Sequence, residues 1–140
     1  MIIPKKTALK IMIGLLLTIL IFHLSILLEI IPYEAVWAGK LNSVEEMYVF
    51  ETISILINVL LLIVLRVKFK NIKTSKSNKI IDVIIWAFVF LFALNTLGNL
   101  FAKSLIEQIL GTVLTAVSAI LCWIIVRKNN KQNPASLNSE

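Results

Sequence analysis

Polar side chains inside long apolar segments are the residues of this sequence best suited to chemistry. They are Glu51, Ser54, Asn58, Asn95 and Asn99. The first three are spaced i, i+3 and i+7, which places them along one face of a helix, and the last two are four residues apart on another helix. Two amides can hydrogen-bond a carboxylate in either protonation state. We therefore expect one shared polar site, with Glu51 beside Asn95 and Asn99 and with Asn58 below them.

Three further residues are secondary candidates for this site. Lys103 continues the line of Asn95 and Asn99 and can reach the same carboxylate from the surface. His23 is the only histidine of the chain, and in an apolar helix it acts either as a proton relay or as a hydrogen-bonded packing residue. Glu29 lies at the end of the same apolar segment and is either solvated or part of a polar helix face.

Four long apolar segments must position these residues. The chain has 140 residues, of which 59% are hydrophobic and 16% charged, so it has too little polar surface for a water-soluble globule. Each segment is long enough to cross the roughly 30 Å hydrocarbon core of a bilayer as a helix. The sequence predicts an all-α integral membrane protein, an antiparallel bundle of four transmembrane helices at about 8–31, 47–66, 80–102 and 105–127. Residues 1–128 form this single domain, and residues 129–140 are expected to be a polar, disordered tail.

The positions of Lys and Arg predict the orientation of the bundle. Twelve of the 14 basic residues precede the first helix, separate the second from the third, or follow the fourth; only Lys40 and Lys103 lie on the opposite side. Because cytoplasmic flanks are enriched in Lys and Arg, both termini are predicted to be cytoplasmic in a multi-pass cell-membrane protein. The net charge of +6 is then an orientation signal and no sign of nucleic-acid binding. The basic stretch Arg66–Lys79 is expected to contact anionic lipid headgroups.

Residues at the non-cytoplasmic side carry signals for helix starts. Ser43–Glu46 and Ser104–Glu107 both fit the S-x-x-E capping box, which pairs free backbone N–H groups at the start of a helix. Residues 32–42 are expected to form a short interfacial helix, in which Tyr33 and Trp37 share one face. Aromatic side chains at this depth are typical of the belts that lie at the headgroups.

Small residues at helical spacing predict two tightly packed helix faces. One consists of Gly14, Thr18, Ser25 and Glu29, and the other of Gly111, Thr115, Ser118 and Cys122. Because small side chains let helices approach closely, we expect both faces to lie in the interior of the bundle. Cys122 has no second cysteine to react with and is expected to be a buried, inert thiol.

The motif content argues against catalysis. One Cys and one His exclude a disulfide framework and a multi-ligand zinc site, no hydrolase or nucleotide-binding motif occurs, and no cofactor or metal is expected.

Three hypotheses about function remain. The first, which we favour, is a small bacterial-type membrane protein that acts as a non-enzymatic accessory or interaction subunit, as a homo-oligomer or with another membrane protein. The second is a solute or proton-coupled transporter with an outward-facing site at Glu51, Asn95 and Asn99. The third is an outer-leaflet enzyme with Glu51 and His23 as acid and base.

Overall fold

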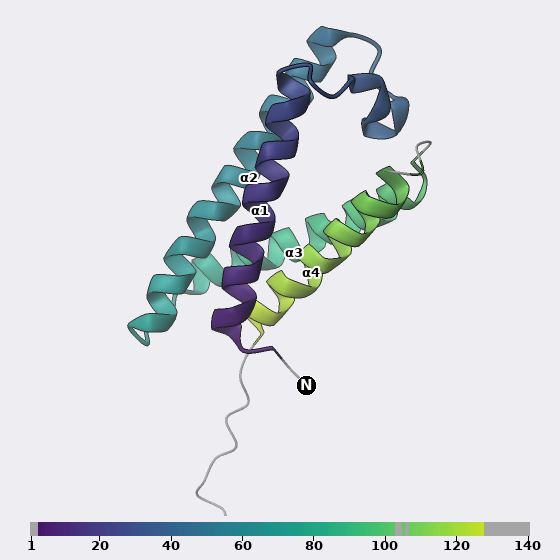
Figure 1. The fold of residues 1–140 in the computed structure, drawn as a ribbon. Coiled ribbons are helices and arrows are strands. Elements are labelled where there is room, and N and C mark those ends of the chain that lie inside the picture. The colour runs from purple at the N-terminus through teal and green to yellow at the C-terminus, as the bar shows by residue number, and fades with distance from the viewer. Residues whose placement is uncertain (1–2, 103–104, 106, 128–140) are drawn as a thin grey trace, which may run out of the picture.

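The computed structural model describes residues 3–102, 105 and 107–127, and within them four helices are long and apolar enough to cross a membrane (Figure 1). They are α1 (Lys5–Leu27), α2 (Val44–Lys73), α3 (Lys79–Leu100) and α4 (Thr112–Val126). A π-helical turn, Glu107–Gly111, precedes α4, and the fourth apolar span includes most of it. The prediction of an all-α protein with four membrane-spanning helices packed as a bundle is confirmed.

The bundle consists of two antiparallel hairpins, α1 with α2 and α3 with α4 (Figure 1). We call the end that holds Lys5, the turn between α2 and α3, and Arg127 the basic end. The opposite end holds the connector, which we define as residues 28–43 between α1 and α2. The hairpins lie together at the basic end and diverge toward the connector end.

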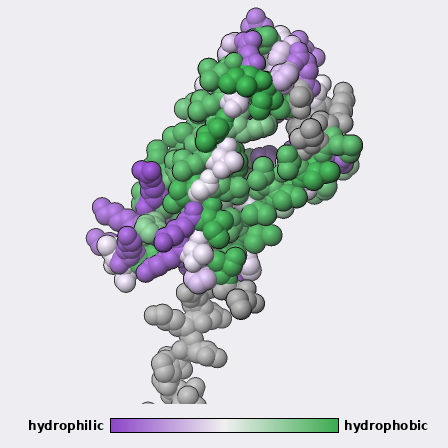
Figure 2. Space-filling view, viewed as in Figure 1, coloured by the Kyte–Doolittle hydropathy of each residue, from purple (hydrophilic) through white to green (hydrophobic). Residues whose placement is uncertain are grey.

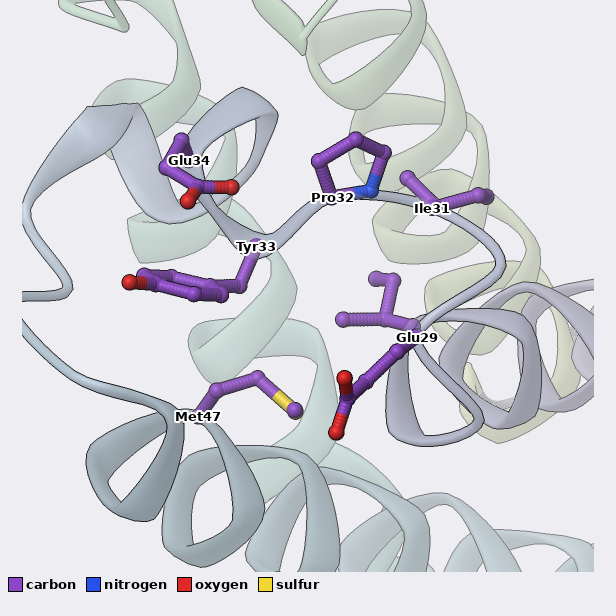
Figure 3. A pocket seen from close by; sticks show the side chains of 7 residues that line it. Glu29, Ile31, Pro32, Tyr33, Glu34 and Met47 are labelled. Atoms are coloured by element: carbon purple, nitrogen blue, oxygen red, sulfur yellow. The ribbon is translucent and has the colours of Figure 1, made fainter.

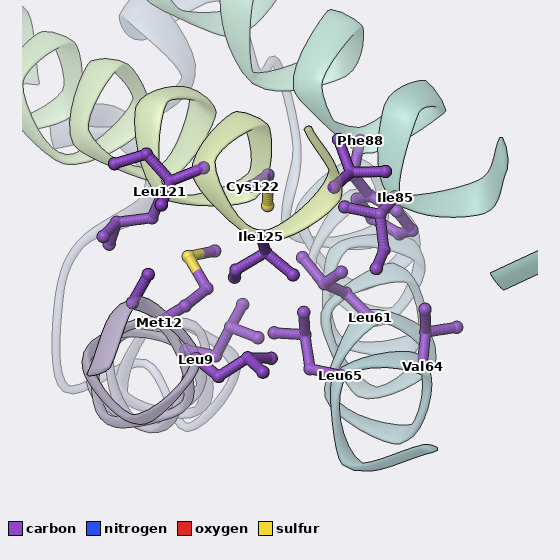
Figure 4. Close-up of a cluster of buried hydrophobic side chains, with 14 of the residues drawn as sticks. Leu9, Met12, Leu61, Val64, Leu65, Ile85, Phe88, Leu121, Cys122 and Ile125 are labelled. Atoms are coloured by element: carbon purple, nitrogen blue, oxygen red, sulfur yellow. The ribbon is translucent and has the colours of Figure 1, made fainter. Parts of the chain in front are cut away.

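The main apolar core lies in the basic half of the bundle (Figure 4). It consists of side chains mainly from the first halves of α1 and α3 and the second halves of α2 and α4. Ile125 and Cys122 of α4 point between Met12 of α1 and Leu61 and Leu65 of α2 in this core. Because all buried core residues except Phe92, just past the middle of α3, lie on the basic half of their helices, the two hairpins contact each other mainly there.

Polar contacts close the basic end. Lys68 of α2 forms an ion pair with Asp82 of α3, and the Lys5 ammonium donates to the carbonyl of Arg127. Asn78 caps α3, since its side-chain oxygen accepts from the backbone N–H groups of residues 80 and 81 at 3.0 and 3.3 Å. These contacts join the first, second, third and fourth helices at one end.

The helix boundaries differ from the hydropathy limits at both ends of α2. The helix was predicted over 47–66 and extends over Val44–Lys73. It starts earlier because the Ser43 hydroxyl accepts from the Glu46 N–H at 3.2 Å, as the capping box predicts. It ends later because Phe69 and Ile72 still pack against the core, so most of the basic stretch predicted as a loop is helical. The link to α3 is thus limited to residues 74–78.

Helix α1 runs over Lys5–Leu27, about one turn earlier than predicted. It ends because Glu29 takes a left-handed conformation, with φ of 57°, and the N–H of Ile30 bonds to the carbonyl of Ser25 at 2.9 Å. This is the pattern of a Schellman cap, in which glycine is the usual left-handed residue. The chain therefore turns away from the α1 axis directly after Leu28.

The connector contains two short 3-10 turns, Tyr33–Ala35 and Trp37–Gly39, in place of the single short helix that was predicted. Val36 separates them in an extended conformation and is buried with Ile26 and Met47 in a second, smaller apolar cluster. The two aromatic side chains therefore do not share one helix face. Part of the connector is thereby packed onto the ends of α1 and α2.

The two predicted small-residue faces have different outcomes. On α4 the prediction is confirmed, because Ser118 and Cys122 are fully buried and Gly111 approaches α3 closely. On α1 it is wrong, because Thr18 is exposed and no atom lies within 4 Å of a Cβ built at Gly14. The Thr18 hydroxyl bonds to its own helix, at the Gly14 carbonyl, and so needs no neighbouring helix.

Three sequence predictions fall outside the described residues. They are the contribution of Lys103 to the site, the second capping box at Ser104–Glu107, and the disordered tail at 129–140.

Candidate functional site

Glu51 is the centre of the polar network in the connector half of the bundle. Its side chain is fully buried, with no exposed surface, although it lies on a membrane-spanning helix. One carboxylate oxygen is 2.6 Å from Nδ1 of His23 on α1. The other accepts a hydrogen bond of 2.7 Å from the indole N–H of Trp37 in the connector. Both oxygens are therefore bonded, each to a different segment of the chain.

Helix geometry brings the two ionisable residues together. His23 lies about one turn before the end of α1, and Glu51 lies two turns after the start of α2, so the antiparallel hairpin places them at similar depth. The His23 side chain is 17% exposed. Because a buried carboxylate is costly unless it is paired and hydrogen-bonded, the imidazole is a necessary partner for Glu51 in this position.

The backbone of Trp37 is strained. Its φ is 55°, in the left-handed region that large side chains rarely adopt, at a cost on the order of 1–3 kcal/mol. Two contacts of its indole offset that cost. One is the hydrogen bond to Glu51, and the other is packing on Phe50, with ring centroids 5.1 Å apart. The position of Trp37 therefore depends on its contacts with α2.

The three side chains form a site that can hold protons. The indole of Trp37 only donates, so the oxygen that it contacts must accept in every protonation state. The contact between Glu51 and His23 holds either a neutral imidazole that donates to the carboxylate or one additional proton shared between the two groups.

Asn95 and Asn99 do not join this network, in contrast to the sequence prediction. Among the described residues, no hydrogen bond links Glu51 to either amide. Asn99 faces α4, where its amide is 3.5 Å from the Thr115 hydroxyl, and Asn95 is exposed. The prediction assumed that α2 faces α3 at this depth, whereas the two hairpins have diverged there. The expected grouping of Glu51 with Asn95 and Asn99 is therefore wrong.

Asn99 belongs instead to a polar contact between α3 and α4. The hydroxyls of Thr96 and Thr115 are 2.9 Å apart, and Thr115 also donates to the carbonyl of Gly111 at 2.7 Å. A Cβ built at Gly111 lies 2.9 Å from the Asn99 amide, so a larger residue there would displace that side chain from its place beside Thr115. This cluster holds the second hairpin together.

Ser54 and Asn58 bond within α2. The Asn58 amide donates to the carbonyl of Ser54 at 2.8 Å, and Asn58 is half-buried. Since this bond satisfies the amide locally, neither residue extends the Glu51 network.

A small pocket lies beside the network at the connector end (Figure 3). Its volume is about 230 Å³, and its lining includes Tyr33, Glu34 and Met47. Glu29 also lines it, and its carboxylate accepts from the Tyr48 hydroxyl at 2.8 Å. Glu29 is thus tied to the start of α2 and takes no part in the His23–Glu51 pair. Among the described residues, no group of three or more His, Cys, Asp or Glu side chains is placed to hold a metal ion.

Sequence reasoning assigned Trp37 to the aromatic belt and treated His23 only as a secondary candidate. The signal that pointed to the pair was their depth, because His23 and Glu51 are the only ionisable residues well inside the first two apolar spans. Trp37 had no such signal, because its position depends on the irregular path of the connector.

Comparison with known proteins adds no assignment: no protein family, no curated protein and no solved structure matches the chain.

Proposed function

We propose that the protein is a non-enzymatic accessory or interaction protein, which binds a transmembrane helix of a partner through α3. The chain is a four-span helical membrane protein in contact with the bilayer. Of its spans, α3 is the least covered, with 17% of its apolar window buried, against 22% for α1 and α2 and 33% for the fourth span. Because this margin over α1 and α2 amounts to a single residue, the observation that carries the proposal is the exposed Asn95 of α3, which has no hydrogen bond to the other described residues.

The exposed face of α3 has the residues that helix association in a membrane uses. Asn95 and Gly98 are three apart and both exposed, and no atom lies within 4 Å of a Cβ built at Gly98. A glycine lets a second helix approach closely, and an amide can bond across the contact. Since Asn95 has no hydrogen bond to the other described residues, a partner helix would satisfy a polar group that otherwise costs free energy in lipid.

The divergence of the hairpins supports the same proposal. Figure 2 shows the two hairpins separated by a notch on the face in view, with apolar side chains along both. Large apolar residues are more than 50% exposed on both hairpins: Leu56 and Ile63 on α2, Leu97 on α3 and Ile120 on α4. Such surface is covered by lipid or by another helix.

The two alternatives receive less support. A carrier was expected to use Glu51 together with Asn95 and Asn99. Glu51 is instead hydrogen-bonded to His23 and Trp37. An enzyme would use His23 and Glu51, yet no hydroxyl or thiol among the described residues hydrogen-bonds to His23. The accessory role needs neither arrangement.

The distribution of charge supports an orientation with the basic end in the cytoplasm. Lys5, Lys68 and Arg127 all lie at this end, together with the turn between α2 and α3. We propose that both termini are cytoplasmic and that the basic residues of Arg66–Lys79 contact anionic headgroups.

Photo-crosslinking in native membranes tests the interaction. A photoreactive amino acid at position 95 should form a discrete protein adduct, and Gly98→Leu should abolish it by blocking close approach. The matched control is the same amino acid at position 97, because Leu97 is 56% exposed on another side of α3. An adduct of twice 15.8 kDa identifies a second copy, and any other mass identifies another protein. Equal yields of adduct at positions 95 and 97, or lipid adducts alone, would contradict the proposal.

A further inference from the structure

We propose that the carboxyl group of Glu51 is a proton-binding site that controls the connector: the connector is held against α1 and α2 while Glu51 is ionised and is released when Glu51 is protonated. This inference does not depend on the proposed partner. It rests on the burial of Glu51, on its two short contacts and on the backbone of Trp37.

The first step concerns what holds the connector in place. Its apolar attachment is a small cluster, in which Ile26, Val36 and Met47 are buried and five partly buried side chains pack around them: Ile31, Tyr33, Trp37, Leu41 and Val44. The hydrogen bond from Trp37 to Glu51 reaches deeper, into α2. A left-handed Trp37 persists only where its contacts outweigh the backbone strain. Loss of that hydrogen bond therefore weakens the whole attachment.

The second step concerns how a proton changes this bond. An ionised carboxylate accepts a charge-assisted hydrogen bond, which is roughly twice as strong as the bond that a neutral acid accepts. Deprotonation of His23 leaves both carboxylate oxygens as acceptors, so the connector stays closed at alkaline pH. Protonation of Glu51 removes its negative charge and gives the carboxyl group an O–H. Because protonated His23 and the indole of Trp37 are both donors, neither can accept a hydrogen bond from that O–H. The direction is thus fixed: acid releases the connector.

Other charged groups near the pair do not supply the same control. On α2, Glu46 bonds to the backbone of Asn42 at 2.9 Å, and Tyr48 donates to Glu29 at the end of α1. In the connector, Glu34 and Lys40 are exposed. The other two helices bring no charge, since residues 83–102 and 108–126 contain no Asp, Glu, Lys or Arg. Glu51 and His23 are therefore the titratable groups in the contact itself.

Cysteine labelling of the full chain in nanodiscs measures the release. Val36→Cys, in a variant without the native cysteine, places a thiol under the closed connector, because Val36 is only 7% exposed. Its rate of reaction with maleimide is divided by the rate for Lys40→Cys, which is always exposed and corrects for the reactivity of the thiol at each pH. We expect the ratio to rise severalfold as the pH is lowered from 8 to about 3.5, because the connector opens only when Glu51 is protonated.

Two variants assign this change to the site. Glu51→Gln keeps an acceptor for Trp37 but cannot titrate, so the ratio should become independent of pH, whereas the matched control Glu46→Gln should behave like the wild type. Trp37→Phe keeps the aromatic packing but removes the donor, so labelling should already be fast at pH 8 and show no acid response. Helical circular dichroism and size-exclusion elution identify any variant that does not fold, and either variant alone is decisive.

Three results would overturn the proposal. They are an unchanged or lower ratio in the wild type at acid pH, an acid response that persists in Glu51→Gln, and one that persists in Trp37→Phe. A failed crosslink at position 95 has no bearing on these results, so this proposal and the proposed function are tested separately.

Discussion

Two threonines of α4, three residues apart, should respond in opposite ways to the same substitution. Thr115 bonds to Thr96 and is near the Asn99 amide, so it joins α3 to α4. The hydroxyl of Thr112 is also buried, but it has no hydrogen-bond partner among the described residues. Valine has nearly the volume of threonine and the same branching at Cβ, so Thr→Val changes the hydrogen bonds and little else.

The magnitudes follow from what each hydroxyl contacts. Interhelical hydrogen bonds in membrane proteins contribute on average about 0.6 kcal/mol, and at most about 1.7 kcal/mol. Thr96 keeps its own bond to the Phe92 carbonyl at 2.8 Å, so Thr115→Val leaves no unpaired hydroxyl there. We expect Thr115→Val to lower the free energy of unfolding by about 1 kcal/mol. Thr112→Val removes an unpaired buried hydroxyl and should raise it by up to about 1 kcal/mol.

Titration with SDS of the bicelle-reconstituted protein, followed by tryptophan fluorescence, measures both values under one condition. The difference between the two variants is the decisive quantity, because lipid composition and helix propensity affect both equally. If Thr112→Val destabilises as much as Thr115→Val does, the assignment of Asn99, Thr96 and Thr115 to a structural contact between α3 and α4 is refuted.

Two other predictions use matched pairs. Gly111→Ala places a methyl group 2.9 Å from the Asn99 amide and should destabilise the hairpin of α3 and α4. In Gly14→Ala the added methyl group meets no atom within 4 Å, so this variant should stabilise α1 by about 0.5–1 kcal/mol. The SDS titration described above measures both changes. If Gly111→Ala is also stabilising, the close approach of α3 and α4 is not as described. For the orientation, a membrane-impermeant thiol reagent applied to intact cells should label Lys40→Cys but not Thr74→Cys, in a variant without the native cysteine. The reverse pattern would place the basic end outside.

The helices were predictable because hydrophobic length is a property of each segment by itself. Uncharged runs of about 20 residues predict membrane spans whatever their neighbours are. The capping of α2 by the Ser43 hydroxyl was also predicted correctly, because that bond forms within one turn of the chain, whereas the Glu46 carboxylate accepts from the Asn42 N–H and not from that of Ser43. The extension of α2 to Lys73 was missed because the hydropathy limit marks the edge of the membrane, whereas a helix continues as long as its side chains can pack.

The site was predicted only in part, because its partners depend on how the helices pair. Glu51 was identified as the central residue, and it is indeed fully buried. Its position along α2 fixes its depth but not the helix that it faces. Residue spacing alone therefore could not decide whether Asn95 or His23 is its hydrogen-bond partner. The role of Trp37 required the path of an irregular segment, which depends on a left-handed residue that no helical pattern predicts.

The divergence of the two hairpins makes the molecule wedge-shaped in the bilayer (Figure 1). Its main apolar core lies in the basic half, so we expect the chain to take up more lateral area in the leaflet at the connector end than in the leaflet at the basic end. We therefore expect inserted copies to expand the two leaflets unequally, so that the membrane would bend with its concave side at the basic end. Binding of the proposed partner helix between the hairpins would change that imbalance, so it would be coupled to the mechanical state of the lipid.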